Sequence, residues 1–313
     1  MSSALTKFKV LDEIPQHLPR IGVNLDSHHV EFLPEAIAGD EPVIFDPSSG
    51  VLGISKRFLQ KAYVSLRKEY TQGCIDVRDN VSAANSQHIM NLTLVVLLQT
   101  TENLNAINTR KRILQNSHFA LELVRDEIRF LNILFSSPLQ KHTKSPMLWQ
   151  HRKWLLQNLE SHSYQHLLQP AYLPSDTKKT WFDLEFEIIL KAGELHTKNY
   201  YAWAYARWLL SHTTPDIQEL SQRMFHICKQ HVSDISMWSF LLHILLLLDN
   251  QDLSLKYAQL TIDEAKLCPN HESMWHFIRT ILAKYNKPHL LDSSNDRLKP
   301  QSKKWISHRI SHS

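Results

Sequence analysis

From Ser55 to about residue 285, hydrophobic positions recur at the spacing of an α-helix. The spacing is clearest in two sets of residues, Phe58, Leu59, Ala62, Tyr63 and Leu66, and Leu184, Ile188, Ala192 and Leu195. Apolar residues three and four apart predict helices that bury one face. The first 54 residues lack this pattern and hold four of the six glycines and five of the thirteen prolines. We expect an irregular N-terminal arm over residues 1–54, with one strand-like piece at Pro42–Asp46.

A tryptophan-centred motif recurs along the helical part of the chain. It appears as SPMLWQHRKWLL, KNYYAWAYARWLL, DISMWSFLLHILL and NHESMWHFIRTIL, around Trp149, Trp203, Trp238 and Trp275. A fifth segment, ENLNAINTRKRIL, fits the same frame with Ile107 in place of the tryptophan. Each interval has room for one further helix, so the repeats predict stacked helical hairpins over residues 55–290. Residues 162–180 predict an inserted loop, and 291–313 a tail or capping segment.

Helix geometry predicts core roles for the motif residues. On a helix, Trp149 and Arg152 share a face, whereas Trp154 points elsewhere. The first tryptophan of a motif is therefore expected inside its own hairpin, and the second, Trp154 or Trp208, against a neighbouring repeat. Arg152 is expected to donate to backbone carbonyls or to a carboxylate between helices, because its planar fork suits both.

Charge and hydropathy exclude two classes of function. Residues 1–50 carry a net charge of −5, so the remainder carries +9, which is too diffuse to indicate a nucleic-acid-binding stripe. The longest apolar run, Leu241–Leu248, is far shorter than the roughly 20 residues of a membrane-spanning helix. Neither end shows a targeting signal, and a cytoplasmic location is expected.

The metal-ligating residue types do not form a recognisable site. Cys74, Cys228 and Cys268 are widely spaced, which indicates buried free thiols and neither a disulfide framework nor a zinc knuckle. Two histidine pairs have helical i, i+4 spacing, His162/His166 and His308/His312, but neither lies in an HExxH motif. No metal site is expected on this chain.

The frame N-Y-x-x-W-x-x-R-x-W resembles the repeat of protein prenyltransferase α-subunits, in five copies over about residues 85 to 285. The strongest copy is Asn199–Trp203, with Trp208 five residues further on. Residues 42–44, 50–53, 231–234 and 269–275 resemble one branch, the α-subunit of geranylgeranyltransferase type III. The chain departs from the motif at the arginine position, which is taken by Ala206, Leu241 and Ile278.

This resemblance implies an architecture and an activity. The expected fold is all-α, a crescent-shaped right-handed superhelix of tetratricopeptide-like hairpins that wraps around a β-subunit shared with Rab geranylgeranyltransferase. That β-subunit would hold the zinc and the isoprenoid cavity, with geranylgeranyl diphosphate as donor. The acceptor would be a protein cysteine, in this branch including that of an already farnesylated SNARE.

The resemblance also implies two catalytic candidates. Lys198 occupies the position of a lysine that contacts the diphosphate in the family, and Tyr200 would add a hydrogen bond or shape the rim. Read without the resemblance, Lys198 is better explained as a solvated loop lysine ahead of the Asn199 cap, and Tyr200 as plain helix packing. Two alternatives stay open for the whole chain: a non-enzymatic helical-repeat scaffold, and an accessory subunit that presents substrate to another transferase.

Overall fold

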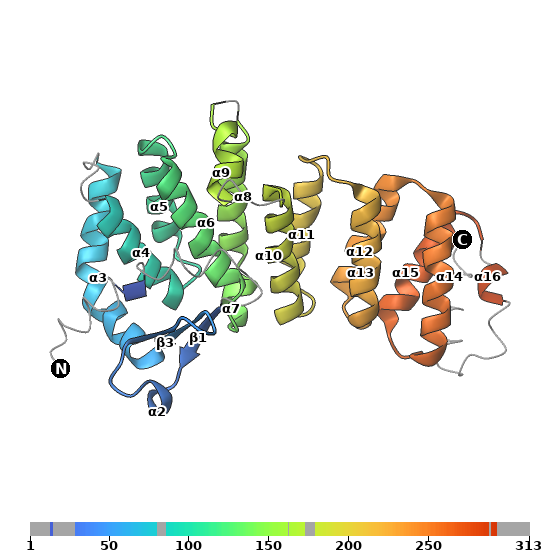
Figure 1. The fold of residues 1–313 in the computed structure, drawn as a ribbon, viewed down its shortest axis with the longest axis horizontal. Helices are drawn as coiled ribbons and strands as arrows, with labels where there is room; N and C mark the ends of the chain where they lie inside the picture. The colour runs from blue at the N-terminus through green and yellow to red at the C-terminus, as the bar shows by residue number, and fades with distance from the viewer. Residues whose placement is uncertain are drawn as a thin grey trace. The chain divides into compact units, whose positions relative to one another are not determined.

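The computed structural model describes residues 13–14, 29–79, 86–161, 163–172, 179–287 and 289–292. The chain divides into two compact units, Met1–His196 and Thr197–Ser313. Helices make up most of both units (Figure 1).

The first unit opens with a small mixed sheet that the sequence did not predict in full. Its strands are β1 (His29–Leu33), β2 (Val43–Asp46) and β3 (Val51–Ser55), in the order β1-β3-β2. A short helix, α2 (Glu35–Ala38), joins β1 to β2. β1 runs parallel to β3, and β2 runs antiparallel to it. The strand-like piece expected at Pro42–Asp46 is β2, so the described part of the expected irregular arm is ordered as a sheet.

Two glycines permit this sheet. Gly50 lies in the β2–β3 turn with a φ of 69°, a backbone conformation that is unfavourable for residues with a side chain. At Gly53 in β3, an added Cβ would meet Leu33 Cδ1 at 2.5 Å, so the glycine permits the close approach of β1. Ser55 ends β3 and directly precedes the first long helix, which couples the sheet to the helical part of the unit.

Paired helices form the rest of the first unit. They are α3 (Lys56–Arg78), α4 (Ser86–Gln99), α5 (Leu104–Asn116), α6 (Leu121–Phe135), α7 (Gln140–Thr143), α8 (Pro146–Leu159), α9 (Leu168–Tyr172) and α10 (Trp181–Leu195). Capping side chains fix several of their starts, because each oxygen accepts from an otherwise unpaired N–H. Asn103 caps α5, Ser145 caps α8, and Thr180 forms a capping box with Asp183 at α10.

The second unit consists of α11 (Tyr200–Leu210), α12 (Ile217–Gln230), α13 (Ile235–Leu248), α14 (Gln251–Leu267), α15 (Glu272–Lys284) and α16 (His289–Asp292). α12 packs on α13 and α14 packs on α15, while α13 also contacts α11 and α15. The motif helices α11, α13 and α15 therefore contact one another in chain order, and α13 and α15 each pack on the helix that precedes them. The predicted all-α class of stacked helical hairpins is confirmed.

The insertion and the tail are described in part. Within the predicted 162–180 loop, a short 3-10 helix (η2, Gln165–Leu167) leads into α9, while residues 162 and 173–178 lie outside the described residues. The tail begins within α16, and residues 293–313 lie outside the described part. Among the described helices, none is long and apolar enough to cross a bilayer. The apolar run Leu241–Leu248 lies in α13, where Leu246 and Leu247 are exposed.

Candidate functional site

The start of α11 holds both predicted catalytic residues. Asn199 is buried and caps the helix, with its Oδ1 accepting from the Ala202 N–H at 3.3 Å. Lys198, directly before the cap, is exposed and has a φ of 59°, in the left-handed region that disfavours a lysine. Such a conformation persists only where surrounding contacts hold it.

Asp234 supplies one of those contacts. One carboxylate oxygen, Oδ2, accepts from the backbone N–H of Lys198 at 2.8 Å. The other, Oδ1, caps α13 by accepting from the N–H groups of Ser236 and Met237 at 2.9 and 3.2 Å. A single buried carboxylate thus fixes the turn before α11 to the start of α13. Asp234 was part of the sequence resemblance, but this positioning role was not predicted.

Tyr200 and Tyr201 follow the cap and are partly open to solvent. The exposed fractions are 68% for Tyr200 and 38% for Tyr201, and the two rings meet edge to face with centroids 5.5 Å apart. Large aromatic surfaces are costly to leave in water. In this unit Tyr200 is not a core residue, so helix packing does not account for its exposed surface.

The structure places a second lysine in the same position of another repeat. Lys144 directly precedes Ser145, the N-cap of α8, as Lys198 precedes Asn199 at α11. Lys144 and Lys141 line an open surface hollow together with Thr101, Glu102, Gln140, Ser145 and Pro146. The sequence reasoning missed Lys144, although the segments KSPMLW and KNYYAW show the equivalence directly.

The first tryptophan of each motif lies in the core. Trp149, Trp203, Trp238 and Trp275 are all buried. Trp203 packs on Phe240 and Trp238 on Phe277, with ring centroids 5.0 and 5.1 Å apart, so each ring contacts an aromatic residue of the next motif helix. Their roles are therefore structural. The second tryptophans, Trp154 and Trp208, are half-buried, and Lys111 lies over the Trp154 ring at 5.0 Å.

The motif arginines of the first unit form buried ion pairs. Arg152 of α8 donates through Nε to both carboxylate oxygens of Glu185 on α10, each at 2.9 Å. Arg110 of α5 pairs in the same way with Glu127 on α6, at 3.0 Å from Nε to each oxygen. Arg152 therefore donates to a carboxylate between helices, one of the two options that the sequence left open. Glu127 and Glu185 were not predicted as partners.

His151 completes the cluster around Glu127. Its Nε2 lies 2.6 Å from Glu127 Oε1, and both side chains are fully buried. Burial alone would raise the pKa of Glu127, but Arg110 and His151 outweigh it and lower that pKa to about 2. Burial lowers the pKa of His151, with Glu127 opposing the shift. This cluster lies in the core, and its role is to join repeats.

Only one of the three cysteines is buried, in contrast to their prediction as buried thiols. All three cysteines are free, and Cys228 is buried as predicted, but Cys74 is half-buried and Cys268 is exposed. Cys268 directly follows the last residue of α14, at a helix end that faces solvent. Within the described residues, no group of three or more His, Cys, Asp or Glu could hold a metal ion. His162, His308 and His312 lie outside them.

Comparison with known proteins gives a consistent group of relatives. The ECM9 middle domain matches residues 148–271. Protein prenyltransferase alpha subunit repeat-containing protein 1 from Homo sapiens is 26% identical over 224 residues, which cover 66% of this chain and 52% of the relative. The 1-A form from Xenopus laevis is 28% identical over 232 residues, 68% of this chain and 50% of the relative. Protein ECM9 from Saccharomyces cerevisiae is 28% identical over 171 residues, which cover 52% of this chain and 41% of the relative.

The chain spans about half the length of the curated relatives that it matches first. The matched family model includes three of the four tryptophan motifs in large part, from Leu148 to His271. The resemblance predicted from the repeats is thus confirmed: this chain is similar to the protein prenyltransferase alpha subunit repeat-containing proteins.

Proposed function

We propose that this chain is the α-subunit of a cytoplasmic heterodimeric protein geranylgeranyltransferase of type III. In this proposal it scaffolds a β-subunit shared with Rab geranylgeranyltransferase. The pair transfers geranylgeranyl from its diphosphate to a protein cysteine, with an already farnesylated SNARE as the acceptor. The similarity to the alpha subunit repeat-containing proteins supports the family part of this proposal.

The observation that carries the catalytic part is the turn at Lys198. An exposed lysine stands in a left-handed conformation, with its backbone tied to Asp234 and an exposed tyrosine two residues later. The ammonium group of a lysine at this position can stabilise the negative charge that develops on a leaving diphosphate. Tyr200 would add a hydroxyl donor at the same helix end.

Zinc and the isoprenoid cavity are assigned to the partner subunit. The described residues offer no ligand set that fits zinc, so no step is assigned to a metal on this chain. When bound by the partner, zinc would supply an activated cysteine thiolate of the acceptor protein. The contribution of this chain would be to position the partner and to place Lys198 and Tyr200 beside the diphosphate.

Coexpression with the Rab geranylgeranyltransferase β-subunit tests the proposal. We expect a one-to-one complex that contains zinc and adds one geranylgeranyl group to a farnesylated SNARE, read by mass spectrometry. A complex without transfer would contradict the assigned donor or acceptor. Absence of any complex would contradict the heterodimer.

Substitution of Lys198 tests the turn within that complex. Lys198→Ala should lower kcat by roughly ten- to a thousandfold while leaving the complex intact, as expected for loss of a transition-state contact. Lys256→Ala, which removes an exposed lysine from α14 of the same unit, is the matched control and should not change kcat. Equal kcat values for wild type and Lys198→Ala would remove Lys198 from the mechanism.

A second candidate function is a non-enzymatic helical-repeat scaffold that binds a protein partner. The observation in its favour is the apolar replacement of the motif arginine at Ala206, Leu241 and Ile278, all buried. In this reading the repeats retain only their packing role. A stable partner complex whose composition excludes a zinc-bearing subunit would favour the scaffold.

A further inference from the structure

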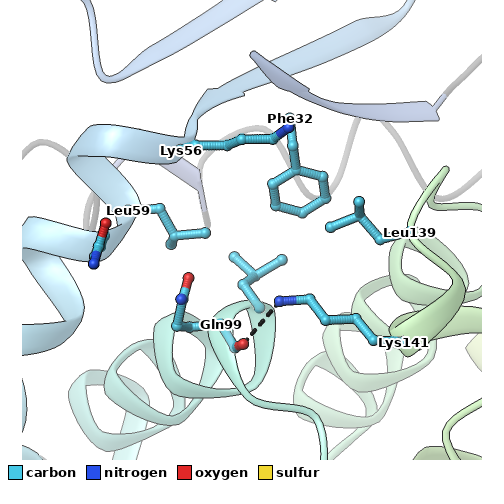
Figure 2. Close-up of a pocket in the computed structure, with 8 residues that line it drawn as sticks. Phe32, Lys56, Leu59, Gln99, Leu139 and Lys141 are labelled. Atoms are coloured by element: carbon cyan, nitrogen blue, oxygen red, sulfur yellow. Dashed lines mark hydrogen bonds between the residues drawn. The ribbon is translucent and has the colours of Figure 1, made fainter. Parts of the chain in front are cut away.

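A small cavity lies in the first unit, where the N-terminal sheet meets the helices. Its volume is about 190 Å³, and Figure 2 shows side chains from β1, α3, α4 and the start of α7 converging on it. The lining comprises four apolar residues, Phe32, Leu59, Leu98 and Leu139, and four polar ones, Lys56, Gln60, Gln99 and Lys141. This site could not be predicted from the sequence, because its members come from segments up to about a hundred residues apart.

The apolar side of the cavity is held in place by a buried histidine. The His142 ring packs on Phe32 with centroids 5.3 Å apart, and its Nε2 lies 2.9 Å from the carbonyl oxygen of Leu98. Its Nδ1 lies 2.8 Å from Ser137 Oγ. Burial lowers the pKa of His142 to about 4, so the imidazole is neutral near pH 7 and adds no charge to this wall.

The polar side carries positive charge. Figure 2 shows Lys56 reaching across one side of the cavity toward Phe32, while Lys141 extends from the opposite side. Lys141 Nζ donates to the carbonyl oxygen of Gln99 at 2.8 Å, which uses one of its three N–H donors. Burial lowers the pKa of Lys141, as expected for an ammonium group set against apolar walls.

None of the described residues that line the cavity is acidic. The hollow next to it shares Lys141 and contains Glu102, whose carboxylate already accepts from Ser145 Oγ at 2.5 Å. The cavity therefore combines an apolar floor with two cationic groups and two carboxamides. An anionic head joined to an apolar body is the ligand chemistry that matches both parts.

The volume restricts the size of that ligand. Pockets for drug-sized molecules measure roughly 300–1,000 Å³. We propose that the cavity binds a short carboxylic acid with a compact branched or aromatic body, which fills the floor formed by Leu59, Leu98 and Leu139 while its carboxylate lies between Lys56 and Lys141.

Titration of the full chain with sodium 4-methylpentanoate tests this site. Carbon-13 methyl spectra of leucine-labelled protein should show saturable shifts of the Leu59, Leu98 and Leu139 methyl groups. The neutral analogue 4-methylpentanamide has the same body without the charge. It should bind roughly ten- to a hundredfold more weakly, because charge-assisted hydrogen bonds are lost.

Variants separate the two parts of the site. Lys56→Gln/Lys141→Gln keeps side-chain length but removes the charge, and should reduce acid affinity to that of the amide. Lys68→Gln/Lys256→Gln makes the same charge change at exposed positions outside the cavity and should bind like wild type. Leu139→Phe, which fills space from a half-buried position, should abolish binding of both probes. Equal binding of acid and amide, or acid shifts that persist in Lys56→Gln/Lys141→Gln, would overturn the proposal.

Discussion

The two units join their repeats by different chemistry. In the first unit, the motif arginines Arg110 and Arg152 reach buried glutamates on α6 and α10, respectively. In the second unit, Leu241 and Ile278 occupy the arginine position, and the motif helices meet through Trp203–Phe240 and Trp238–Phe277. One polar contact, from Arg207 to Ser239 Oγ at 2.9 Å, also joins α11 to α13. The same hairpin frame thus accommodates buried ion pairs in one unit and mainly aromatic packing in the other.

The comparison shows what the motif arginine contributes. A buried ion pair costs desolvation energy that its attraction only partly offsets, so an apolar pair of similar volume can be equally stable. Both residues of a buried ion pair must be present, however, because removal of one leaves the other as an uncompensated buried charge. The first unit should therefore be more sensitive to single polar substitutions and to acid than the second.

Removal of Glu127 should have the largest effect. Glu127→Ala leaves Arg110 and His151 buried without their shared acceptor and should lower the free energy of unfolding by about 3–5 kcal/mol. Urea denaturation of wild type and variant measures this. Glu122→Ala, on the exposed face of the same helix, should cost less than about 1 kcal/mol. Similar losses for both variants would contradict a special role for the buried cluster.

Removal of Trp238 should damage the second unit to a slightly smaller extent. Trp238→Ala opens a cavity beside Phe277 and should cost about 3–4 kcal/mol. The measurement is again urea denaturation, with Trp238→Phe as a milder variant that keeps a ring at the junction. If Trp238→Ala cost under 1 kcal/mol, aromatic packing would not be what holds these helices together.

Acidification should destabilise the first unit by about 2 kcal/mol through His142. Its pKa is about 4 in the folded chain against an ordinary 6.5, so the unfolded state binds more protons between these values. The contribution of neutral His142 to the free energy of unfolding is complete above pH 6.5 and is lost as the pH falls toward 4. The lowered pKa values of His151 and Glu127 act in the same direction, the latter between about 4.5 and 2.

The pH prediction is checked with His142→Gln, which cannot titrate. The free energy of unfolding should fall between pH 7 and pH 4.5 by about 2 kcal/mol more in wild type than in the variant. Parallel pH curves for the two proteins would show that His142 is not the group responsible.

Conversion of one junction to the other type should have the smallest effect. Arg152→Leu/Glu185→Leu gives the first unit an apolar junction and should change the free energy of unfolding by no more than about 1 kcal/mol. Arg152→Leu alone should cost about 3 kcal/mol, because Glu185 then lies buried without its cation. A double variant as unstable as the single one would mean that the two junctions are not interchangeable.

Much of the fold could be predicted from sequence because it follows a local period. The helices and their tryptophan repeats are visible in apolar spacing, and in α3 the spacing indicates the buried residues Phe58, Leu59, Ala62 and Leu66. In α10 the spacing was less exact, because Ile188 and Ala192 are buried but Leu195 is exposed. The N-terminal sheet could not be predicted in this way. Its parallel pair joins β1 to β3 across about twenty residues, and it depends on the close approach of Leu33 to Gly53.

Only part of the candidate site could be predicted from the sequence. Lys198 and Tyr200 stand in a motif that sequence displays, but the left-handed turn and its tie to Asp234 are tertiary features. Glu127 and Glu185 look like surface residues of amphipathic helices, because a single glutamate carries no local sign of burial. The 190 Å³ cavity is assembled from four separate elements and leaves no trace in any one of them.

The indole hydrogen bonds of Trp149 and Trp275 limit where this chain can change length. Each indole N–H donates to a carbonyl oxygen six residues earlier, that of Thr143 or Pro269, at 2.8 Å. This bond fixes the length of the connection that leads into each of these motif helices, because extra residues there would break it. Insertions are tolerated after the motif helix instead, where η2 and α9 follow α8. A repeat that has this bond can lengthen after its motif helix, whereas the connection before that helix must keep its length.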